Sequence, residues 1–192
     1  MNIFYLHHNP KTCAEYHNDK HCVKMILEYG QLMSTAHRIL DGTHYYGKTA
    51  NGRNISRWLL EDPVREAALW KASHINHPSA VWTRESRGNY YWLYHLWTSL
   101  MDEYHHRYGK QHSARKLMTH LVSAPQNIPS GLFTQPTPAM PDDCKVYDEV
   151  ATDRFTLDSI ASYRNYYNKN KTHLAKWKNR PVPIWYVGNI ES

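Results

Sequence analysis

A helical pattern that runs from residue 19 to residue 40 constrains the fold of this chain more than any other feature. At 3.6 residues per turn, its apolar side chains fall on one continuous face. That face consists of Cys22, Met25, Tyr29, Leu32, Met33, Ala36 and Leu40. The pair Asp41-Gly42 supplies a stop signal directly after it. A helix of this length must bury its apolar face, so we expect the other elements to pack around it.

A polar stripe follows one edge of that apolar face. It consists of His21, Lys24, Glu28, Gln31 and Thr35. Burial at the margin of a core shifts the pKa of such groups, so we predict His21, Lys24 and Glu28 as catalytic residues. An imidazole transfers protons near neutral pH, and a lysine one turn along holds a phosphate or loses its proton on burial. The alternative is an ordinary surface ion pair between Lys24 and Glu28.

The spacing of His17 and His21 also suits a metal site. Residues four apart share one face if a single helix runs through both, and zinc sites use this spacing. No glutamate stands between them, and Asp19 is a residue type that ends one helix and caps another. On the metal hypothesis the cofactor is a divalent metal such as zinc, held by His17, His21 and His77.

Size and composition favour a single domain that contacts nucleic acid. The 192 residues suffice for one well-packed core, and no run of about 18 apolar residues predicts a membrane span. Three cysteines without Cys-x-x-Cys spacing predict neither a disulfide framework nor a zinc ribbon, and they fit a reducing cytoplasm. The 14 His, 15 Tyr and 7 Trp, with a net charge of +6, suit a polyanion that carries stackable rings. We therefore expect nucleic acid or a nucleotide as partner, and no membrane.

Apolar periodicity and capping signals predict a chain made mostly of helices. The predicted helices cover residues 10–17, 54–60, 63–73, 80–108, 113–122 and 159–177. Gly88 lies inside the longest of these and marks either close packing or a break. The fold class is therefore mainly α, a single-domain helical bundle over residues 1–192 with short N- and C-terminal strands or extended segments.

The remaining segments are predicted as loops and terminal strands. Residues 1–6 are interpreted as a first strand and residues 182–187 as an edge strand beside it. Residues 43–53 are polar and are interpreted as an exposed loop. Residues 124–144 hold five prolines among apolar side chains, which predicts an ordered loop laid across the domain.

The turn from His74 to Ser79 gathers polar side chains before a predicted helix. Ser79 is a suitable N-cap, and a helix N-terminus presents free amide groups and a positive dipole to an anion. Arg84, in the first turns of that helix, adds a bidentate phosphate contact. We predict Asn76, Ser79 and Arg84 as substrate- or phosphate-binding residues. In the local alternative, Asn76 closes the turn and Ser79 only caps the helix.

The clearest nucleic-acid signal lies near the C-terminus. Residues 163–180 include six Lys or Arg and no Asp or Glu, with Tyr and Trp interleaved. Cations neutralise phosphates, and exposed rings stack on bases. We predict Arg164, Lys176 and Trp177 as phosphate- or base-binding residues. Because the helix also needs an apolar face, several of the rings are expected to lie in the core instead.

Six segments, spread over most of the chain, form a familiar combination. They are Met1–Leu6, His17–Glu28, His74–Trp82, Gln135–Asp142, Ser162–Tyr167 and Lys176–Trp177. Together they resemble a family of small proteins encoded by large tailed bacteriophages. The resemblance implies a phage protein that acts in the host cytoplasm. Such phages often encode enzymes that modify, repair or recycle nucleotides, and small proteins that counter host defences.

Two functional hypotheses follow. No Walker-type loop, Gly-x-Gly-x-x-Gly or Gly-x-Ser-x-Gly motif is present. The leading hypothesis is a phage-encoded transferase or hydrolase that acts on a nucleobase or nucleotide, foremost by DNA base modification, in a His/Lys/Glu pocket. The competing hypothesis is a non-catalytic phage protein that binds a host protein, a signalling nucleotide or DNA. Catalysis requires His21, Lys24 and Glu28 to converge on a hollow beside His77, whereas binding tolerates them scattered.

Overall fold

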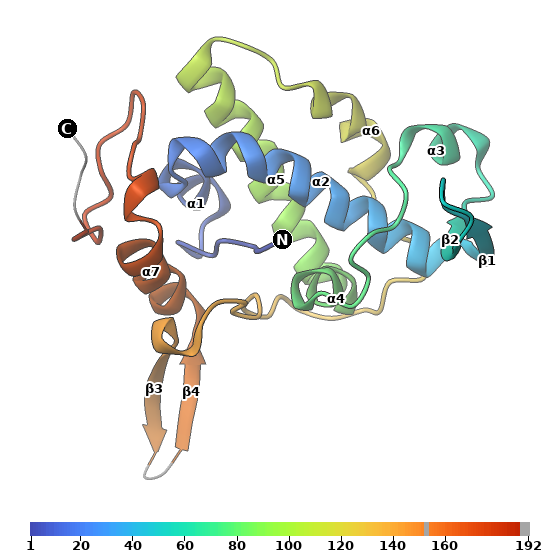
Figure 1. Cartoon of the computed structure of the whole chain (residues 1–192). Coiled ribbons are helices and arrows are strands. Elements are labelled where there is room, and N and C mark those ends of the chain that lie inside the picture. The colour runs from blue at the N-terminus through green and yellow to red at the C-terminus, as the bar shows by residue number, and fades with distance from the viewer. Residues whose placement is uncertain (152–153, 189–192) are drawn as a thin grey trace.

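The central element is α2 (Asp19–Asp41), which crosses the middle of the molecule in Figure 1. The computed structural model describes residues 1–151 and 154–188. The predicted apolar face is confirmed, because its members from Cys22 to Ala36 are buried and Leu40 packs at the edge of the same core. The helix α5 (Arg87–Tyr108) packs against α2, and the indole of Trp97 donates a hydrogen bond of 2.8 Å to the Ile26 carbonyl across this contact. This helix pair forms the centre of the core.

The described residues form seven α-helices, short 3-10 turns and two antiparallel hairpins. The other helices are α1 (Pro10–Tyr16), α3 (Pro63–Ala68), α4 (Pro78–Glu85), α6 (Met118–Leu121) and α7 (Ser159–Asn170). The 3-10 turns are η1 (Ser113–Leu117), η2 (Asp142–Cys144) and η3 (Thr172–Leu174). One hairpin pairs β1 (Thr43–Lys48) with β2 (Asn54–Leu59), and the other pairs β3 (Val146–Ala151) with β4 (Arg154–Asp158). The fold is helix-dominated as predicted, but it is a mixed fold rather than a pure bundle, with its strands in internal hairpins. None of the described helices is long and apolar enough to cross a membrane.

The β1–β2 hairpin corrects two predictions, the loop over residues 43–53 and the helix over residues 54–60. Its pairs run from Thr43 opposite Leu59 to Lys48 opposite Asn54. The turn contains Gly52, whose φ of 74° suits a residue without a Cβ. The strands contain Tyr, Trp, Ile and Thr, which favour pleated structure. They were missed because β1 is exposed almost throughout, so no alternation of apolar and polar residues marks it.

The predicted helix over residues 80–108 breaks at Ser86, whose side chain accepts a hydrogen bond from the backbone of α5 and caps it. The backbone N–H groups of Arg87 and Gly88 donate to carbonyls of the proline-rich segment instead of to α4. A Cβ at Gly88 would lie 2.4 Å from the Phe133 nitrogen. Both alternatives for Gly88 therefore hold, since the helix breaks where this segment approaches most closely.

Other helix bounds also differ from the predictions. The helix predicted over residues 63–73 ends at Ala68, and the last helix ends at Asn170. Residues 113–122 form η1 followed by α6 rather than one helix. These short elements have few turns of their own, so tertiary packing rather than helix propensity decides their length.

The proline-rich segment, residues 124–141, contains no helix or strand and runs along the lower edge of the molecule in Figure 1. The Asp41 carboxylate accepts a hydrogen bond of 2.9 Å from the Gln126 backbone. The Trp82 indole donates one of 3.2 Å to the Thr134 carbonyl. The segment is therefore tied to both α2 and α4.

The two terminal segments do not pair as strands. Residues 3–6 are buried, but they belong to no sheet. Residues 182–187 include a turn instead of a strand, because Pro183 removes an N–H that a ladder needs. The Arg164 side chain takes the place of a strand partner and donates a hydrogen bond of 3.0 Å to the Leu6 carbonyl. The predicted edge strand beside the first segment is therefore wrong.

A buried charge network holds the C-terminal segment at the start of α2. The carboxylate of Glu103, which is 3% exposed, accepts hydrogen bonds from Arg107 at 2.6 Å and from Arg180 at 2.8 Å. Arg107 also donates to Asp19 at 2.9 Å. The same Asp19 oxygen accepts the backbone N–H of Lys178 at 2.9 Å. This network joins α2, α5 and the segment after α7 into one unit.

Candidate functional site

His17 is a structural residue of the core. Its Nδ1 lies 2.7 Å from the Cys13 carbonyl oxygen and its Nε2 lies 3.0 Å from the Tyr29 hydroxyl. A carbonyl only accepts, so Nδ1 carries the proton, and the Tyr29 hydroxyl donates to Nε2 while it accepts the Phe4 N–H. Burial lowers the pKa of His17 to about 4, which keeps the ring neutral. Both ring nitrogens of His17 are therefore hydrogen-bonded to other core residues.

The predicted metal site does not form. Asn18 caps α2 between His17 and His21, so no single helix runs through the pair. The Nδ1 atom of His77 accepts the Ser79 N–H at 3.2 Å. In the part of the chain that the structure describes, no group of three or more His, Cys, Asp or Glu is arranged to hold a metal ion. The donor set His17, His21 and His77 therefore does not fit zinc.

His21 is nearly buried and keeps one ring nitrogen open. It is 5% exposed, and its ring stacks on Phe4 with centroids 4.1 Å apart. Its Nδ1 lies 2.6 Å from the Tyr167 hydroxyl, which also accepts the backbone N–H of Asn18. The described residues offer this hydroxyl no other acceptor, so its proton goes to Nδ1 and the ring proton remains on Nε2. His21 therefore presents a neutral N–H donor.

Cations from two distant parts of the chain act on His21. Lys24 lies one turn along α2, whereas Lys171 and His173 follow α7. Burial lowers the pKa of His21 to about 2, and smaller effects of His17, Lys171, Lys24 and His173 act in the same direction. A neutral imidazole among cations donates a hydrogen bond to an anion or a carbonyl oxygen, and does not serve as a charged acid.

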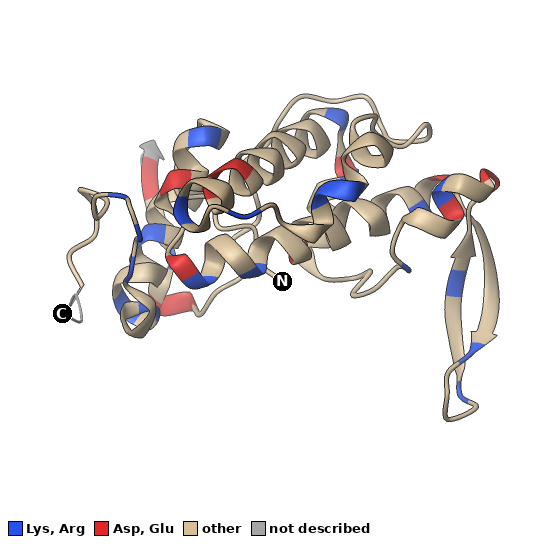
Figure 2. Cartoon of the chain, turned by 90° about the horizontal axis from the view of Figure 1, so that it is seen from above, with Lys and Arg blue, Asp and Glu red and all other residues tan. Residues whose placement is uncertain are grey.

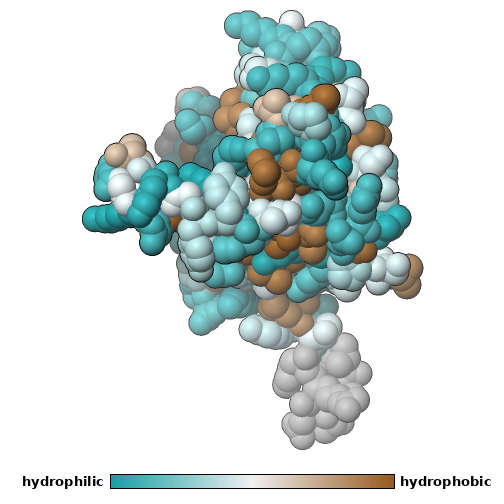
Figure 3. All heavy atoms as spheres, turned by 90° about the vertical axis from the view of Figure 1, so that its right-hand side faces the viewer, coloured by the Kyte–Doolittle hydropathy of each residue, from teal (hydrophilic) through white to brown (hydrophobic). Residues whose placement is uncertain are grey.

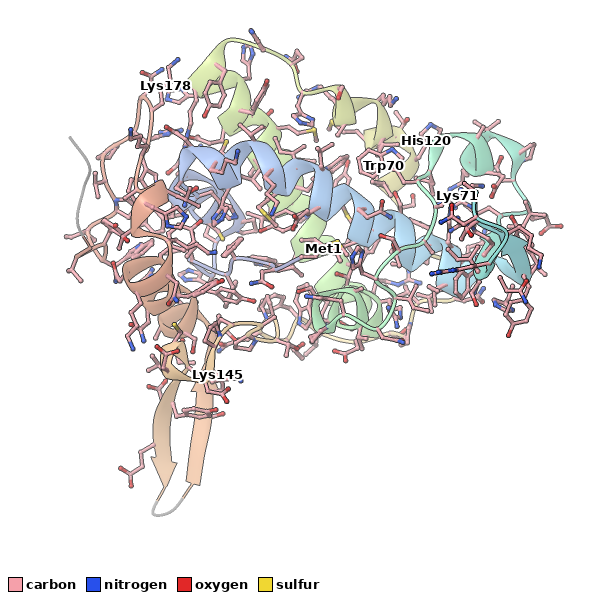
Figure 4. The ribbon with its side chains drawn as sticks, viewed as in Figure 1. Met1, Trp70, Lys71, His120, Lys145 and Lys178 are labelled. Atoms are coloured by element: carbon pink, nitrogen blue, oxygen red, sulfur yellow. The ribbon has the colours of Figure 1, made fainter. Side chains whose placement is uncertain are left out.

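The basic segment after α7 lies directly against the start of α2. The backbone N–H of Asp19 donates to the Lys176 carbonyl at 2.8 Å. A hollow of about 420 Å³ at this junction is lined by Asp19, Lys20, Val23, Tyr108, His173, Leu174 and Lys176. Lys178 stands beside it near the end of α5, with its Nζ 5.4 Å from the centre of the Tyr108 ring (Figure 4). We call this junction the basic hollow.

The other end of the predicted stripe opens on a second hollow. Its volume is about 400 Å³, and its lining consists of Met1, Leu27, Glu28, Gln31, Trp70, Ser73 and His74. His74 holds a left-handed backbone conformation with φ 50°, a strain of the kind that gathers at functional sites. We call this the Trp70 hollow. An aromatic wall with a few polar groups is typical of small-molecule sites.

Lys24 lies between His21 and Glu28 on α2. Its ammonium pairs with the Glu28 carboxylate at 3.1 Å, and its side chain is 59% exposed. Burial lowers the pKa of His77, and the Glu28 carboxylate opposes that shift, so Glu28 lies within electrostatic reach of the predicted turn. The structure therefore brings Glu28 near the turn that contains His77. His21 instead packs against Phe4 and Tyr167, so the three predicted residues do not share one pocket.

The predicted anion site at the start of α4 is not formed as expected. His77 caps this helix, and Ser79 is 1% exposed with an unpaired hydroxyl oxygen. Arg84 lies in the last turn of the eight-residue helix, at the end opposite the cap. Asn76 is exposed. The predicted cap and the placement of Arg84 are wrong, because the helix has only eight residues and begins at Pro78, two residues before the predicted start.

Two of the three C-terminal candidates face inward. Trp177 is 7% exposed, and its indole donates to the Tyr16 carbonyl at 2.9 Å. The Arg164 guanidinium lies 5.3 Å over the Trp185 ring. Lys176 is exposed at the basic hollow. Among these candidates, only Lys176 is placed to meet a phosphate in solution.

Comparison with models of known protein families, with characterised sequences and with solved structures finds no match. Sequence reasoning missed Tyr167 as the partner of His21, and Trp70 as a wall of the second hollow. Tyr167 lies 146 residues from His21, and the abundance of tyrosine was the only signal that pointed to it.

Proposed function

We propose that this protein is a phage-encoded enzyme of the host cytoplasm that acts on a nucleobase or nucleotide, with DNA base modification as the leading reaction. The observation that carries the proposal is the convergence of the nearly buried His21 with cations from α2 and from the segment after α7. Three buried, unbridged cysteines fit a reducing compartment.

The basic hollow is suited to phosphates. Lys20 and Lys176 line it, and Lys24 and Lys171 lie within electrostatic reach of His21 beside it. Ammonium groups neutralise phosphate charge in a way that depends on salt. His21 follows Lys20 in the chain, and its Nε2–H is left as a donor for a phosphate or carbonyl oxygen.

The Trp70 hollow is suited to a base. An indole face stacks on a nucleobase, and such stacking contributes about 1–3 kcal/mol per base. Glu28, Gln31 and Ser73 supply polar groups on the same lining. The Glu28 carboxylate is the group that accepts a proton from the substrate, and the Lys24 ammonium stabilises the negative charge of that carboxylate. Transferases and hydrolases both use such a proton acceptor.

The test is nucleoside mass spectrometry after incubation with DNA or with free nucleotides. We expect a product of altered mass from the wild type, lost in Glu28→Gln and reduced in His21→Gln. The matched control is Lys116→Gln, an exposed site that is not part of the lining of either hollow. Product formation that is equal in Glu28→Gln and in the control would contradict the assignment.

The surface ion pair between Lys24 and Glu28 favours a second candidate function. In that alternative the protein is a non-catalytic phage protein that binds a host protein, a signalling nucleotide or DNA. Fluorescence anisotropy with labelled nucleotides and DNA separates the two. Binding that is lost in Lys20→Gln with Lys176→Gln, without any product of altered mass, supports the alternative.

A further inference from the structure

The β1–β2 hairpin is an arm that projects from the helical body and carries only positive formal charge. In Figure 2 the arm bears bands of Lys or Arg and none of Asp or Glu, and in Figure 3 it extends to the left as a mostly hydrophilic projection. Its cations are Lys48, Arg53 and Arg57, and residues 43–60 contain no Asp or Glu. The arm is therefore a local concentration of positive charge at one end of α2.

These three cations have no acidic partner within the described chain. No ion pair includes Lys48, Arg53 or Arg57. The other hairpin differs, because Lys145 at its base pairs with Asp142 at 2.6 Å. Lys48 donates a hydrogen bond of 2.6 Å to the neutral Asn54 side chain, which does not cancel its charge. Cations without an internal counter-charge attract an external polyanion.

The register of the arm sets an exposed aromatic ring beside a cation on each face. Tyr45 lies opposite Arg57, and these directly paired residues share one face. Tyr46 and Lys48 are two apart on β1 and share the other face. Tyr45 is 44% exposed and Tyr46 is 75% exposed, so neither ring belongs to the core.

The arm is held firmly at its root. The buried Arg38 donates to the Trp58 carbonyl at 2.9 Å and pairs with Glu66. Glu66 also accepts the Leu60 N–H at 2.9 Å. A pre-formed arm loses little conformational entropy on binding. Ser73 and His74 line both the Trp70 hollow and a hollow against β2, so the two hollows are neighbours.

We propose that the β1–β2 arm binds duplex DNA by entering the major groove, with Lys48, Arg53 and Arg57 on the flanking phosphates. A major groove about 12 Å wide and about 8.5 Å deep admits a two-stranded ribbon. Strands of this length reach roughly 20 Å, which exceeds that depth. The inference rests on the proposed function for its choice of DNA, and it deepens that function by naming the duplex as the bound form. The arm holds the duplex beside the Trp70 hollow.

The test is fluorescence anisotropy with a 20-base-pair duplex and with one of its single strands, over a range of salt concentrations. The variant combines Lys48→Gln, Arg53→Gln and Arg57→Gln. We expect duplex affinity to fall roughly a hundredfold at about 0.1 M salt, and the slope of log affinity against log salt to shrink by about 2.7, because each phosphate contact contributes about 0.9. Single-strand affinity is expected to fall less.

The matched control removes the same charge from exposed sites outside the arm, and it combines Lys11→Gln, Lys110→Gln and Lys116→Gln. Circular dichroism and thermal midpoints check that both triple variants fold. Equal duplex affinity and equal salt slope in the two variants overturn the proposal, as does a single-strand loss that matches the duplex loss or a wild type that does not bind duplex.

The two proposals fail in different ways. If arm-dependent duplex binding occurs but no product of altered mass depends on Glu28, the proposed function fails and the arm assignment stands. If free nucleotides are converted normally by the arm variant and duplex affinity does not change, the arm assignment fails and the proposed function stands.

Discussion

Replacing Glu103 by Gln tests the charge network that holds the C-terminal segment at α2. The Glu103 carboxylate is 3% exposed and accepts hydrogen bonds from Arg107 and Arg180. Gln keeps the shape but removes the charge, and its amide N–H group faces guanidinium donors. Removing one partner of a buried ion pair costs about 3–5 kcal/mol. Since Asp19 still pairs with Arg107, we expect a loss near the lower end, about 3 kcal/mol.

The assay is urea unfolding at pH 7, with the free energy of unfolding taken by linear extrapolation. The matched control is Asp102→Asn, because this neighbouring carboxylate is 76% exposed and pairs with Arg115 only at the surface. We expect that control to change stability by less than about 1 kcal/mol. A double variant, Glu103→Leu with Arg107→Met, should recover part of the loss, because no charge then stays buried alone.

The same carboxylate makes stability depend on pH. Burial alone would raise the pKa of Glu103, but hydrogen bonds from Arg180 and Arg107 outweigh it and hold the pKa below its usual value. The stabilisation is therefore complete above the unfolded pKa of about 4.3, and it is lost as the pH falls through the lower folded pKa. The free energy of unfolding of the wild type should exceed that of Glu103→Gln by the full amount above about pH 5, and this difference should vanish in more acidic solution. If the two proteins differ by less than about 1 kcal/mol at pH 7, the network is not needed for stability and the reasoning is refuted.

Three further predictions concern the core and use the same unfolding assay. Tyr29→Phe leaves the Phe4 N–H and the His17 Nε2 without a partner, so we expect a loss of about 1–3 kcal/mol for each group; a total below about 1 kcal/mol would contradict this. Gly88→Ala places a Cβ 2.4 Å from backbone of the proline-rich segment and should cost about 1–3 kcal/mol or more, whereas an unchanged midpoint would show that the segment moves freely. Burial lowers the pKa of His21 to about 2, so between that value and pH 6.5 the His21 ring takes up a proton only in the unfolded chain. As the pH falls through this range, the free energy of unfolding of the wild type should decrease by roughly 1.4 kcal/mol per pH unit more than that of His21→Gln. Parallel curves of stability against pH for the two proteins would disprove this.

Local rules predicted much of the helical framework. The apolar face of α2 was confirmed because a period of 3.6 residues over so long a stretch has few other interpretations. Asn9, Asp62 and Asp158 cap helices as their types indicate, each through a hydrogen bond to a backbone N–H a few residues ahead. Such signals act within one turn, so the sequence carries them directly.

The hairpins and helix breaks were not predictable in the same way. A strand such as β1 is defined by its partner β2, and its exposed side chains show no alternation of buried and exposed positions. The break at Ser86 depends on carbonyls of the proline-rich segment, more than forty residues along the chain. In both cases the deciding hydrogen bonds come from another element.

The candidate site was likewise only partly predictable from the sequence. The sequence by itself determined that His21, Lys24 and Glu28 share one edge of α2 and that a cluster of cations lies near the C-terminus. Only the tertiary structure decided that His21 pairs with Tyr167, that Trp177 is buried and that Lys176 meets the start of α2. The physical reason is that periodicity fixes the face of a helix, whereas the groups that meet that face are chosen by the packing of the whole core.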